Sequence, residues 1–388
     1  MILYFLLEGS TPVNGHALIE QLSVIRDPRQ AWKIEHQLTD ILLLVICGVI
    51  AGAEGWEEIE DFGHERLDWL QQYGDFSAGI PAHDTIARVL GSISAKRFQL
   101  VFSDWMKACH ELTKGDVIVI DGKTIRRSYD KSKRQGAIHM VSAFSNANNL
   151  VLGQVKTDEK SNEITAIPEL LKLLEIRECL VTLDAMGCQR EIARQIVKQG
   201  GDYLLAVKDN QKKLANAFRQ HFSALKLQNW DGDSFITEEV NRGRKETRVH
   251  VVSPIFDEFV DFSFEWARLT TLCAVVSFRT ERGDEHATAS IRYFISSAKL
   301  SAKELAEGSR SHWAIENKLH WKLDVAMRED NCRIRRGESP EILAGVRHIA
   351  VNLLTNESSF KAGLKRKQKK AAMSTTYLAQ VLAGSEVS

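Results

Sequence analysis

The stretch "VIVIDGKTIRRS", residues 117–128, decides the fold, because the elements that follow can be ordered from it. Four β-branched residues in a row predict a buried strand, and Asp121 stands directly after them. A glycine, Lys123, Arg126 and Arg127 come close behind. A carboxylate at a strand end with cations after it is either a solvated turn or one wall of a polar site, and the neighbouring elements decide between the two.

Short strands and helices alternate after this first strand. Two strands joined by a tight turn follow the first strand, and the three together are predicted to form an antiparallel meander. The expected elements are a strand at 136–145, a strand at 151–157, a helix at 163–174, a strand at 179–185, a helix at 189–200 and a strand at 202–208. We therefore predict an α/β fold with a ribonuclease-H-like mixed sheet core, because a doubly wound nucleotide-binding fold needs parallel strands from the outset.

The pattern of the sequence divides the chain into four parts. Residues 1–16 match no recognisable pattern and form a leader, and residues 17–112 have the spacing of an N-terminal helical domain, for which DNA binding is one candidate role. Residues 113–360 carry the ribonuclease-H-like core, with alternating runs at about 208–300 that predict a β-rich insertion. Residues 361–388 begin with six bases and no acid in ten positions, which predicts a basic C-terminal tail.

Composition is that of an ordinary globular protein, with 388 residues, 44% hydrophobic content and a net charge of zero. Balanced charge argues against a protein that coats nucleic acid, but six bases face one acid between residues 123 and 134. The apolar runs at 2–7 and 41–53 are too short to cross a bilayer. Six cysteines without a C-x-x-C pair indicate reduced residues, so we expect a cytoplasmic protein with no membrane partner.

Two aspartates are expected to meet at one edge of the predicted sheet. Asp121 ends the first strand and Asp184 ends the fourth, and these strands are parallel neighbours in the proposed order. Adjacent carboxylates repel each other, and a divalent cation removes that penalty. The sequence therefore predicts a metal site at this edge, for which Mg²⁺ is the most suitable ion.

A helix at residues 312–325 supplies a third acidic side chain. Its apolar residues recur every four positions and predict a buried stripe, beside which His312, Glu316 and His320 form a second stripe. Glu316 then lies at the rim of the core and faces the strand ends. We expect it to complete a triad with the two aspartates.

Each of these acids also has a plainer interpretation. Asp121 or Asp184 alone is compatible with a turn residue or a helix cap. Glu316 alone can be an exposed glutamate that pairs with Lys318 or Lys322 on its own helix. Other candidates for the third acid follow in the sequence, namely Asp324, Glu329 and Asp330.

Several long strings in this chain are more distinctive than any short motif. Among them are "DPRQAWKIEHQLTDILLLVICGVIAGAEGWEEIEDFG", "IDGKTIRRSYDKSKRQGAIHMVSAFS", "GGDYLLAVKDNQ" and "HWAIENKLHWKLDV". Through these strings the chain from about residue 18 to residue 388 resembles the H-repeat-associated proteins, an insertion-sequence family of DDE transposases. The resemblance implies a ribonuclease-H-like catalytic core with a metal-binding triad at the positions of Asp121, Asp184 and Glu316.

The resemblance also implies an activity, a cofactor and a partner. The activity is metal-dependent DNA cleavage and strand transfer of an insertion-sequence-like element, with Mg²⁺ as cofactor and Mn²⁺ able to replace it. The partner is double-stranded DNA, both element ends and target, on which copies of the protein associate at the nucleoid. Two alternatives stay open: a ribonuclease-H-fold nuclease without strand transfer, and a DNA-binding relative that has lost catalysis.

The cations near the triad are the expected DNA contacts, since they can bind phosphates of the substrate strand. Broader relatives carry Tyr, Arg and Lys around the third acid, where this chain has Ser309, His312 and Leu323. We expect Arg310 and Lys322 to supply the cations instead. The full set of expected DNA contacts is Lys123, Arg126, Arg127, Arg190, Arg244, Arg310, His312, His320 and Lys322.

Overall fold

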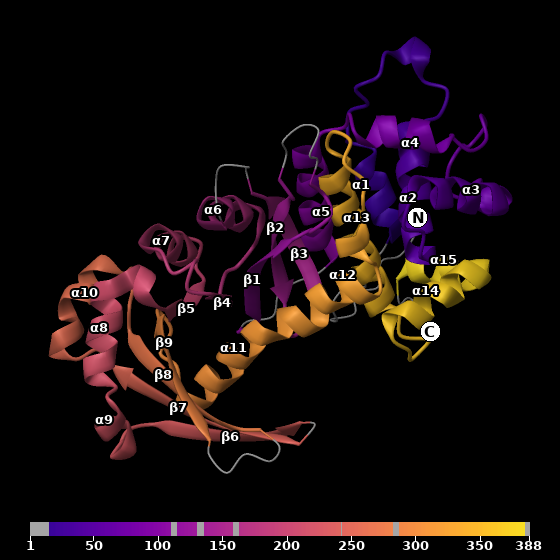
Figure 1. The fold of residues 1–388 in the computed structure, drawn as a ribbon. Coiled ribbons are helices and arrows are strands. Elements are labelled where there is room, and N and C mark those ends of the chain that lie inside the picture. Colours follow the sequence, from indigo (N-terminus) through magenta and orange to yellow (C-terminus); the bar gives the residue numbers. More distant parts are fainter. Residues whose placement is uncertain are drawn as a thin grey trace, which may run out of the picture.

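The molecule is elongated, with a helical body at one end, a mixed sheet in the middle and a second group of strands and helices at the other end (Figure 1). The computed structural model describes residues 15–109, 115–129, 136–157, 163–241, 243–281 and 287–384. The predicted leader, residues 1–16, lies outside this description except for its last two residues, which begin the first helix.

Within the described residues, one nine-stranded sheet runs in the order β3-β2-β1-β4-β5-β9-β8-β7-β6. Its strands are β1 (Val117–Thr124), β2 (His139–Ser145), β3 (Leu150–Lys156), β4 (Leu180–Leu183), β5 (Asp202–Val207), β6 (Ser234–Asn241), β7 (Arg244–Pro254), β8 (Thr271–Thr280) and β9 (Thr288–Ser296). The first three strands form an antiparallel meander, while β4 pairs parallel with β1 and β5 pairs parallel with β4. This is the ribonuclease-H-like arrangement, so the predicted α/β fold class is confirmed.

Helices cover both faces of this half of the sheet. The α-helices of the described residues, in chain order, are α1 (Gly15–Leu22), α2 (Leu38–Ala51), α3 (Trp56–Leu70), α4 (His83–Leu90), α5 (Ala95–Cys109), α6 (Glu163–Leu173), α7 (Arg190–Lys198), α8 (Lys212–His221), α9 (Ala224–Gln228), α10 (Val260–Glu265), α11 (Ala302–Ile315), α12 (Trp321–Val325), α13 (Ser339–Asn356), α14 (Leu364–Met373) and α15 (Thr375–Ala383). α6 and α7 pack on the face that buries Ile118 and Ile120, and α5, α11 and α13 pack on the face that buries Val119. Because successive residues of a strand point to opposite faces, the run "VIVI" serves both layers.

The β-rich segment within residues 208–300 extends the same sheet. Strands β6 to β9 pair antiparallel in sequence order, and β9 returns to pair with β5, where Leu205 lies opposite Ile295. Phe218, Phe259 and Trp266 from the helical segments around this region are buried against one face. α11 packs on the other face, against β6 and β7.

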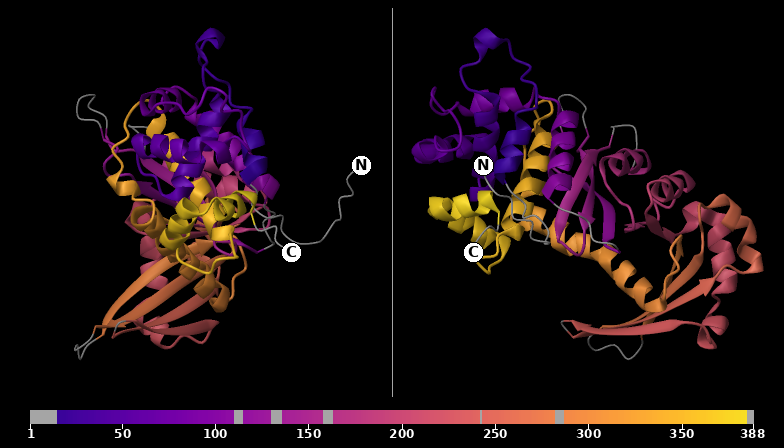
Figure 2. Two further views of the ribbon diagram at one scale, coloured as in Figure 1. Left: turned by 90° about the vertical axis from the view of Figure 1, so that its right-hand side faces the viewer. Right: turned by 180° about the vertical axis from the view of Figure 1, so that it is seen from behind.

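The N-terminal and C-terminal helices share one hydrophobic core. Residues 41–47 of α2 are at most 1% exposed, and α13, α14 and α15 pack against that helix. Figure 2 shows the C-terminal helices, in yellow, beside the indigo N-terminal helices. The predicted basic tail at 361–388 is therefore wrong over residues 364–383, which are helical because Leu378 and Val381 bury their side chains in this core.

Within the described ranges, no single helix has the length and the apolar content to cross a membrane. Only α2 and α3 taken together meet that test, and the pair is bent by 98°.

Candidate active site

Two aspartates lie at the carboxyl edge of the parallel strands. β1 and β4 pair as far as Ile120 opposite Leu183, so Asp121 and Asp184 are the next residues on neighbouring strands. The prediction that Asp121 ends its strand is wrong, because β1 continues to Thr124 and pairs there with β2. Asp184 begins a turn and accepts hydrogen bonds from two backbone N–H groups of that turn, at 2.8 and 3.1 Å.

A π-helical turn brings the third acid to this edge. Between α11 and α12, residues Glu316–His320 form a π-helix, a conformation that recurs at functional sites. Glu316 and His320 lie beside Asp121, and one ligand atom from each of the three lies within 4.8 Å of the others. Asp121, Asp184 and Glu316 line one cavity of about 240 Å³, which we call the acid cavity.

Glu316 lies beside this cavity without a lysine partner. Lys318 donates a hydrogen bond to Asn146 Oδ1 at 3.0 Å, and Lys322 donates one to Thr355 Oγ1 at 3.4 Å. Within the described part of the chain, no ion pair joins Glu316 to either lysine. The lysine pairing that the alternative expects is therefore absent, whereas the exposure that it expects is present, since Glu316 is exposed.

The acidic groups at this edge repel one another. Burial raises the pKa of Asp121 to about 7, and the charges of Glu163, Asp184 and Glu316 add to the rise. Burial lowers the pKa of His320 to about 4, so its imidazole is neutral at pH 7. Its Nε2 has no hydrogen-bond partner among the described residues. Clustered carboxylates with a neutral imidazole nitrogen beside them fit a divalent cation, which offsets the repulsion.

A fourth acid and a histidine lie over Gly122, next to Asp121, and neither was expected from the sequence. Glu163 Oε1, at the start of α6, lies 2.7 Å from His139 Nε2 on β2. A Cβ added to Gly122 would stand 2.2 Å from Glu163 Oε1 and 2.3 Å from His139 Nε2. The glycine after Asp121 thus lets this pair approach β1. Only the register of β1 and β2, in which His139 lies opposite Thr124, could have pointed to it.

Two cations that the sequence analysis leaves out also line the acid cavity. Lys208 follows β5 directly, and Arg292 lies on β9. Val207 pairs with Tyr293, so Lys208 and Arg292 are the next positions outward on these two strands. The reasoning that found Asp184 could have found Lys208, because both follow a parallel strand. No local sequence pattern pointed to Arg292, because only the pairing of β9 with β5 brings it to the acid cavity.

Lys123 is held by an acidic cluster of the protein itself. Its Nζ lies 2.8 Å from Asp324, 2.9 Å from Glu329 and 3.3 Å from Asp330, and its side chain is only 11% exposed. These three carboxylates are the other candidates for the third acid. The contacts tie β1 to α12 and to the segment after it, and they leave Lys123 little freedom to bind a phosphate.

The other expected DNA contacts differ in how free their charges are. His312 lines the acid cavity, His320 lies beside Asp121, and Arg127 is exposed at the surface. Arg126 is 81% exposed but lies 3.2 Å from Asp330. The rest are engaged within the protein: Arg190 with Glu265, Arg244 with Glu246, Arg310 with Glu239 and Lys322 with Thr355. Neither Arg310 nor Lys322 lines the acid cavity, and contact with DNA stays a prediction for the whole set.

The sequence matches known families and relatives over almost its whole length. Residues 19–106 match the family described as DDE_Tnp_1-associated, and residues 112–353 match the family described as Transposase DDE domain. The H repeat-associated putative transposase YhhI of Escherichia coli (strain K12) is 57% identical, covering 96% of this chain and 99% of its own. The putative transposase YncI of Escherichia coli O157:H7 is 56% identical, covering 95% of this chain and 94% of its own.

A solved structure gives a weaker likeness. The piggyBac transposase, in a synaptic complex with hairpin DNA, has a TM-score of 0.45 and 11% identity. The match covers 97% of this chain and 79% of that chain.

Proposed function

This chain belongs to the DDE transposase family, and from that premise we propose that it cuts DNA and transfers the cut strands of an insertion-sequence-like element at the acid cavity. The observation that carries the proposal is the convergence of Asp121, Asp184 and Glu316 from β1, β4 and the π-helical turn. These residues are far apart in the sequence, and the fold is what brings them to one cavity.

The three acids are the residues that would hold divalent metal ions, with Mg²⁺ expected and Mn²⁺ able to replace it. When bound, such ions supply the charge that activates a water or a 3′-hydroxyl and stabilises the departing oxygen of a phosphodiester. The role of the protein is to hold the three acidic side chains in position. The paired strands β1 and β4 set the spacing of Asp121 and Asp184, and the π-helical turn directs Glu316 toward them.

DNA is the proposed partner, both the element ends and the target, with copies of the protein associating on it. Two narrower functions are distinguished by what the protein makes from this DNA. A nuclease without strand transfer leaves nicked ends that are never joined to a second DNA. A relative that has lost catalysis binds the same DNA without cutting it, although the presence of all three acids argues against such a loss.

A Mg²⁺-dependent assay on the DNA that flanks the coding region tests the proposal. The wild type should give cut products first and joined products later. Asp184→Asn and Glu316→Gln should each lower the cutting rate by about a thousandfold or more while DNA binding is kept, because each removes a ligand of the ions that stabilise the reacting charges. Matched controls are Asp104→Asn and Glu175→Gln, whose side chains are 65% and 69% exposed in surface ion pairs.

The outcomes separate the candidates. Cut DNA that never joins would favour the nuclease, and binding without cutting by the wild type would favour the inactive relative. Full activity of Glu316→Gln together with an inactive Asp324→Asn or Glu329→Gln would refute the assignment of the third acid.

A further inference from the structure

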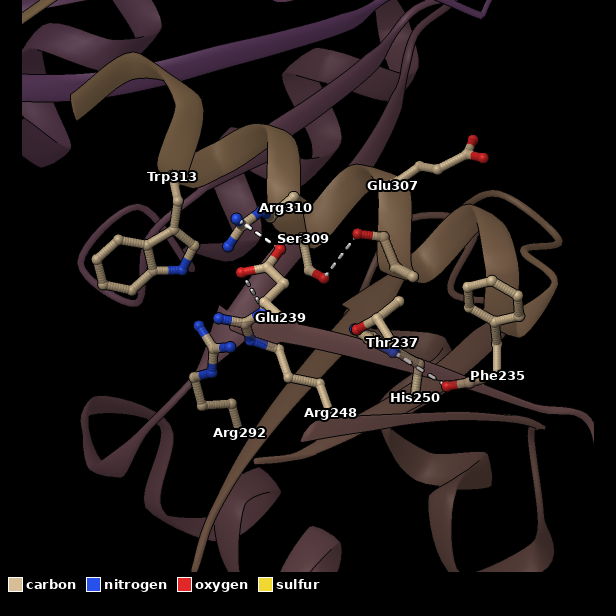
Figure 3. A pocket seen from close by; sticks show the side chains of 11 residues that line it. Phe235, Thr237, Glu239, Arg248, His250, Arg292, Glu307, Ser309, Arg310 and Trp313 are labelled. Atoms are coloured by element: carbon tan, nitrogen blue, oxygen red, sulfur yellow. Dashed lines mark hydrogen bonds and ion pairs between the residues drawn. The ribbon is translucent and has the colours of Figure 1, made fainter. Parts of the chain in front are cut away.

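A second cavity, of about 180 Å³, lies between α11 and the strands β6, β7 and β9 (Figure 3). Three arginines line it, with Arg248 on β7, Arg292 on β9 and Arg310 on α11, and we call it the arginine cavity. Guanidinium groups that converge on a hollow suit a phosphate or a carboxylate, because their N–H donors match the oxygens of these groups.

The strand register explains why these cations share one face of the sheet. His250 on β7 lies opposite Val275 on β8, and Val275 lies opposite Arg292 on β9. Arg248 is two residues from His250 and therefore points to the same face. Arg310 approaches this face from α11, and Figure 3 shows the side chains of the three arginines on the same side of the cavity.

The nearby carboxylates neutralise only two of the three arginines. Glu239 lies 2.6 Å from Arg310 and 3.3 Å from Arg248, and Glu246 lies 2.8 Å from Arg248. No carboxylate lies within ion-pair distance of Arg292 among the described residues. Glu246 also lies 3.6 Å from Arg244, so these two carboxylates serve three other arginines and Arg292 stands outside their ion pairs.

Arg292 is held in place without being neutralised. Its side chain is partly buried, and its guanidinium carbon lies 5.8 Å from the centre of the Trp313 ring, within the range of a cation–π contact. Burial and the charge of Arg248 lower the pKa of Arg292 and outweigh the opposite effect of the more distant Glu246, so an anion in direct contact would stabilise its cationic form further. Glu307 also lines the cavity, but Figure 3 shows its carboxylate turned away from the arginines.

The arginine cavity and the acid cavity adjoin. Arg292, Ser309 and Trp313 line both of them. A DNA strand whose scissile phosphate lies at the three acids therefore passes Arg292 if it continues toward β7. The acids alone would repel that strand, and a cation at the boundary of the two cavities offsets the repulsion.

We propose that the arginine cavity binds a phosphate of the cut strand next to the scissile one, with Arg292 as the group that contacts it. This inference rests on the proposed function, because that function supplies the strand at the acid cavity. Arg292 is then a positioning residue that reads charge and not base sequence. A purely structural role fits it poorly, since an arginine without a counter-ion adds little to stability when it is half-buried.

Salt dependence of DNA binding tests this contact without any need for catalysis. The probe is labelled duplex DNA from the region that flanks the coding sequence, and affinity is measured in chelator over a range of salt concentrations. Arg292→Ala should flatten the slope of log affinity against log salt by about 0.9, the value for one phosphate contact. Arg292→Lys should keep the wild-type slope because it keeps the charge. Arg177→Ala is the matched control, since it removes an exposed arginine at the opposite end of β4.

A second readout is the cutting rate with Mg²⁺, which should fall about tenfold to a hundredfold in Arg292→Ala, the size expected for one charge-assisted hydrogen bond. A slope for Arg292→Ala equal to that of Arg177→Ala would overturn the inference. Failure of the proposed function looks different, because the slope would still change in chelator while the wild type would not cut with Mg²⁺. If Arg292→Ala lowers the melting temperature, Arg292→Gln decides by the same comparison.

Discussion

Charged side chains are buried both where α13, α14 and α15 meet and in the acid cavity, but their surroundings differ. Where the helices meet, Glu357 is 3% exposed and accepts hydrogen bonds from the Ser359 backbone N–H at 2.6 Å and from the Tyr377 hydroxyl at 2.5 Å. Lys367 lies 3.5 Å from the same carboxylate and donates to the Leu354 carbonyl oxygen at 2.8 Å. The carboxylate and the ammonium therefore satisfy each other and share further partners.

At the acid cavity Asp184 accepts two backbone hydrogen bonds, but other buried groups lack a compensating partner. Asp121 faces other acids, His320 has a buried nitrogen without a partner among the described residues, and Arg292 has no carboxylate within ion-pair distance. Buried groups of this kind cost folding free energy unless a ligand compensates them. The contrast indicates that the charged groups of the helix junction contribute to stability, whereas the uncompensated groups of the acid cavity are typical of a ligand-binding site.

The two carboxyl groups show this difference in the sign of their pKa shifts. Burial tends to raise the pKa of both. At Glu357, hydrogen bonds from Ser359 and Tyr377 and the charge of Lys367 outweigh burial and lower the pKa. At Asp121 the neighbouring acids add to burial and raise the pKa to about 7. Burial also lowers the pKa of Lys367 despite the nearby carboxylate, so the carboxylate is the partner that gains more from the contact.

The largest expected effect is on stability at the helix junction. Glu357→Ala should lower the free energy of unfolding by about 3 to 5 kcal/mol, because it removes both the counter-ion of the buried Lys367 and the acceptor for Ser359 and Tyr377. Denaturant unfolding at pH 7 measures this loss. Glu175→Ala, at a side chain that is 69% exposed, is the control and should change stability by less than about 0.5 kcal/mol. A loss below about 1 kcal/mol for Glu357→Ala would remove the contrast between the two regions.

The acid cavity should respond in the opposite direction. Burial and the neighbouring acids raise the pKa of Asp121 to about 7 in the folded protein, whereas in the unfolded chain its pKa is near the ordinary value of 3.8. Between these values the folded state binds the extra proton, so stability falls as pH rises through this window. Asp121→Asn removes the titration, and at pH 8 in chelator it should be more stable than the wild type by about 2 to 4 kcal/mol.

Thermal or denaturant unfolding of wild type and Asp121→Asn at a series of pH values checks this prediction. The advantage of the variant should shrink as pH falls toward 4, where aspartic acid and asparagine are both neutral. Addition of Mg²⁺ at pH 8 should stabilise the wild type more than the variant. A variant that is equally or less stable than the wild type at pH 8 would contradict the repulsion at this edge.

The smallest effect expected is the pH dependence at the helix junction. The pKa of Glu357 is lowered in the folded state, so its contribution is present above the unfolded value of about 4.5 and is lost as pH falls through the lower folded value. Glu357→Gln should therefore be less stable than the wild type by about 1 to 2 kcal/mol at pH 7, the size of a charged hydrogen bond. The gap should close at strongly acidic pH. A gap that does not change with pH would mean that packing, and not charge, holds Glu357.

Local patterns were enough to predict the strands and helices of the ribonuclease-H-like core. The run "VIVI", the turn after residue 145 and the alternation of helices and strands each carry their signal within a few residues. The charges of residues 361–370 led to the wrong prediction of a tail. The apolar residues of α14 and α15 instead pack against α2, which is far away in the sequence. Local charge is a weak guide wherever burial depends on a distant helix.

The residues of the candidate site likewise fall into those that local sequence predicts and those that only long-range contacts bring there. The sequence by itself determined the order of the core strands, and with it the adjacency of Asp121 and Asp184, because parallel pairing follows from the alternation of elements. The tertiary structure decided the rest. In the folded chain, Lys123 forms ion pairs with an acidic cluster, and Glu163 lies over Gly122. The pairing of β9 with β5 brings Arg292 to the acid cavity. The physical reason is that these partners meet through long-range contacts, whose register no local pattern encodes.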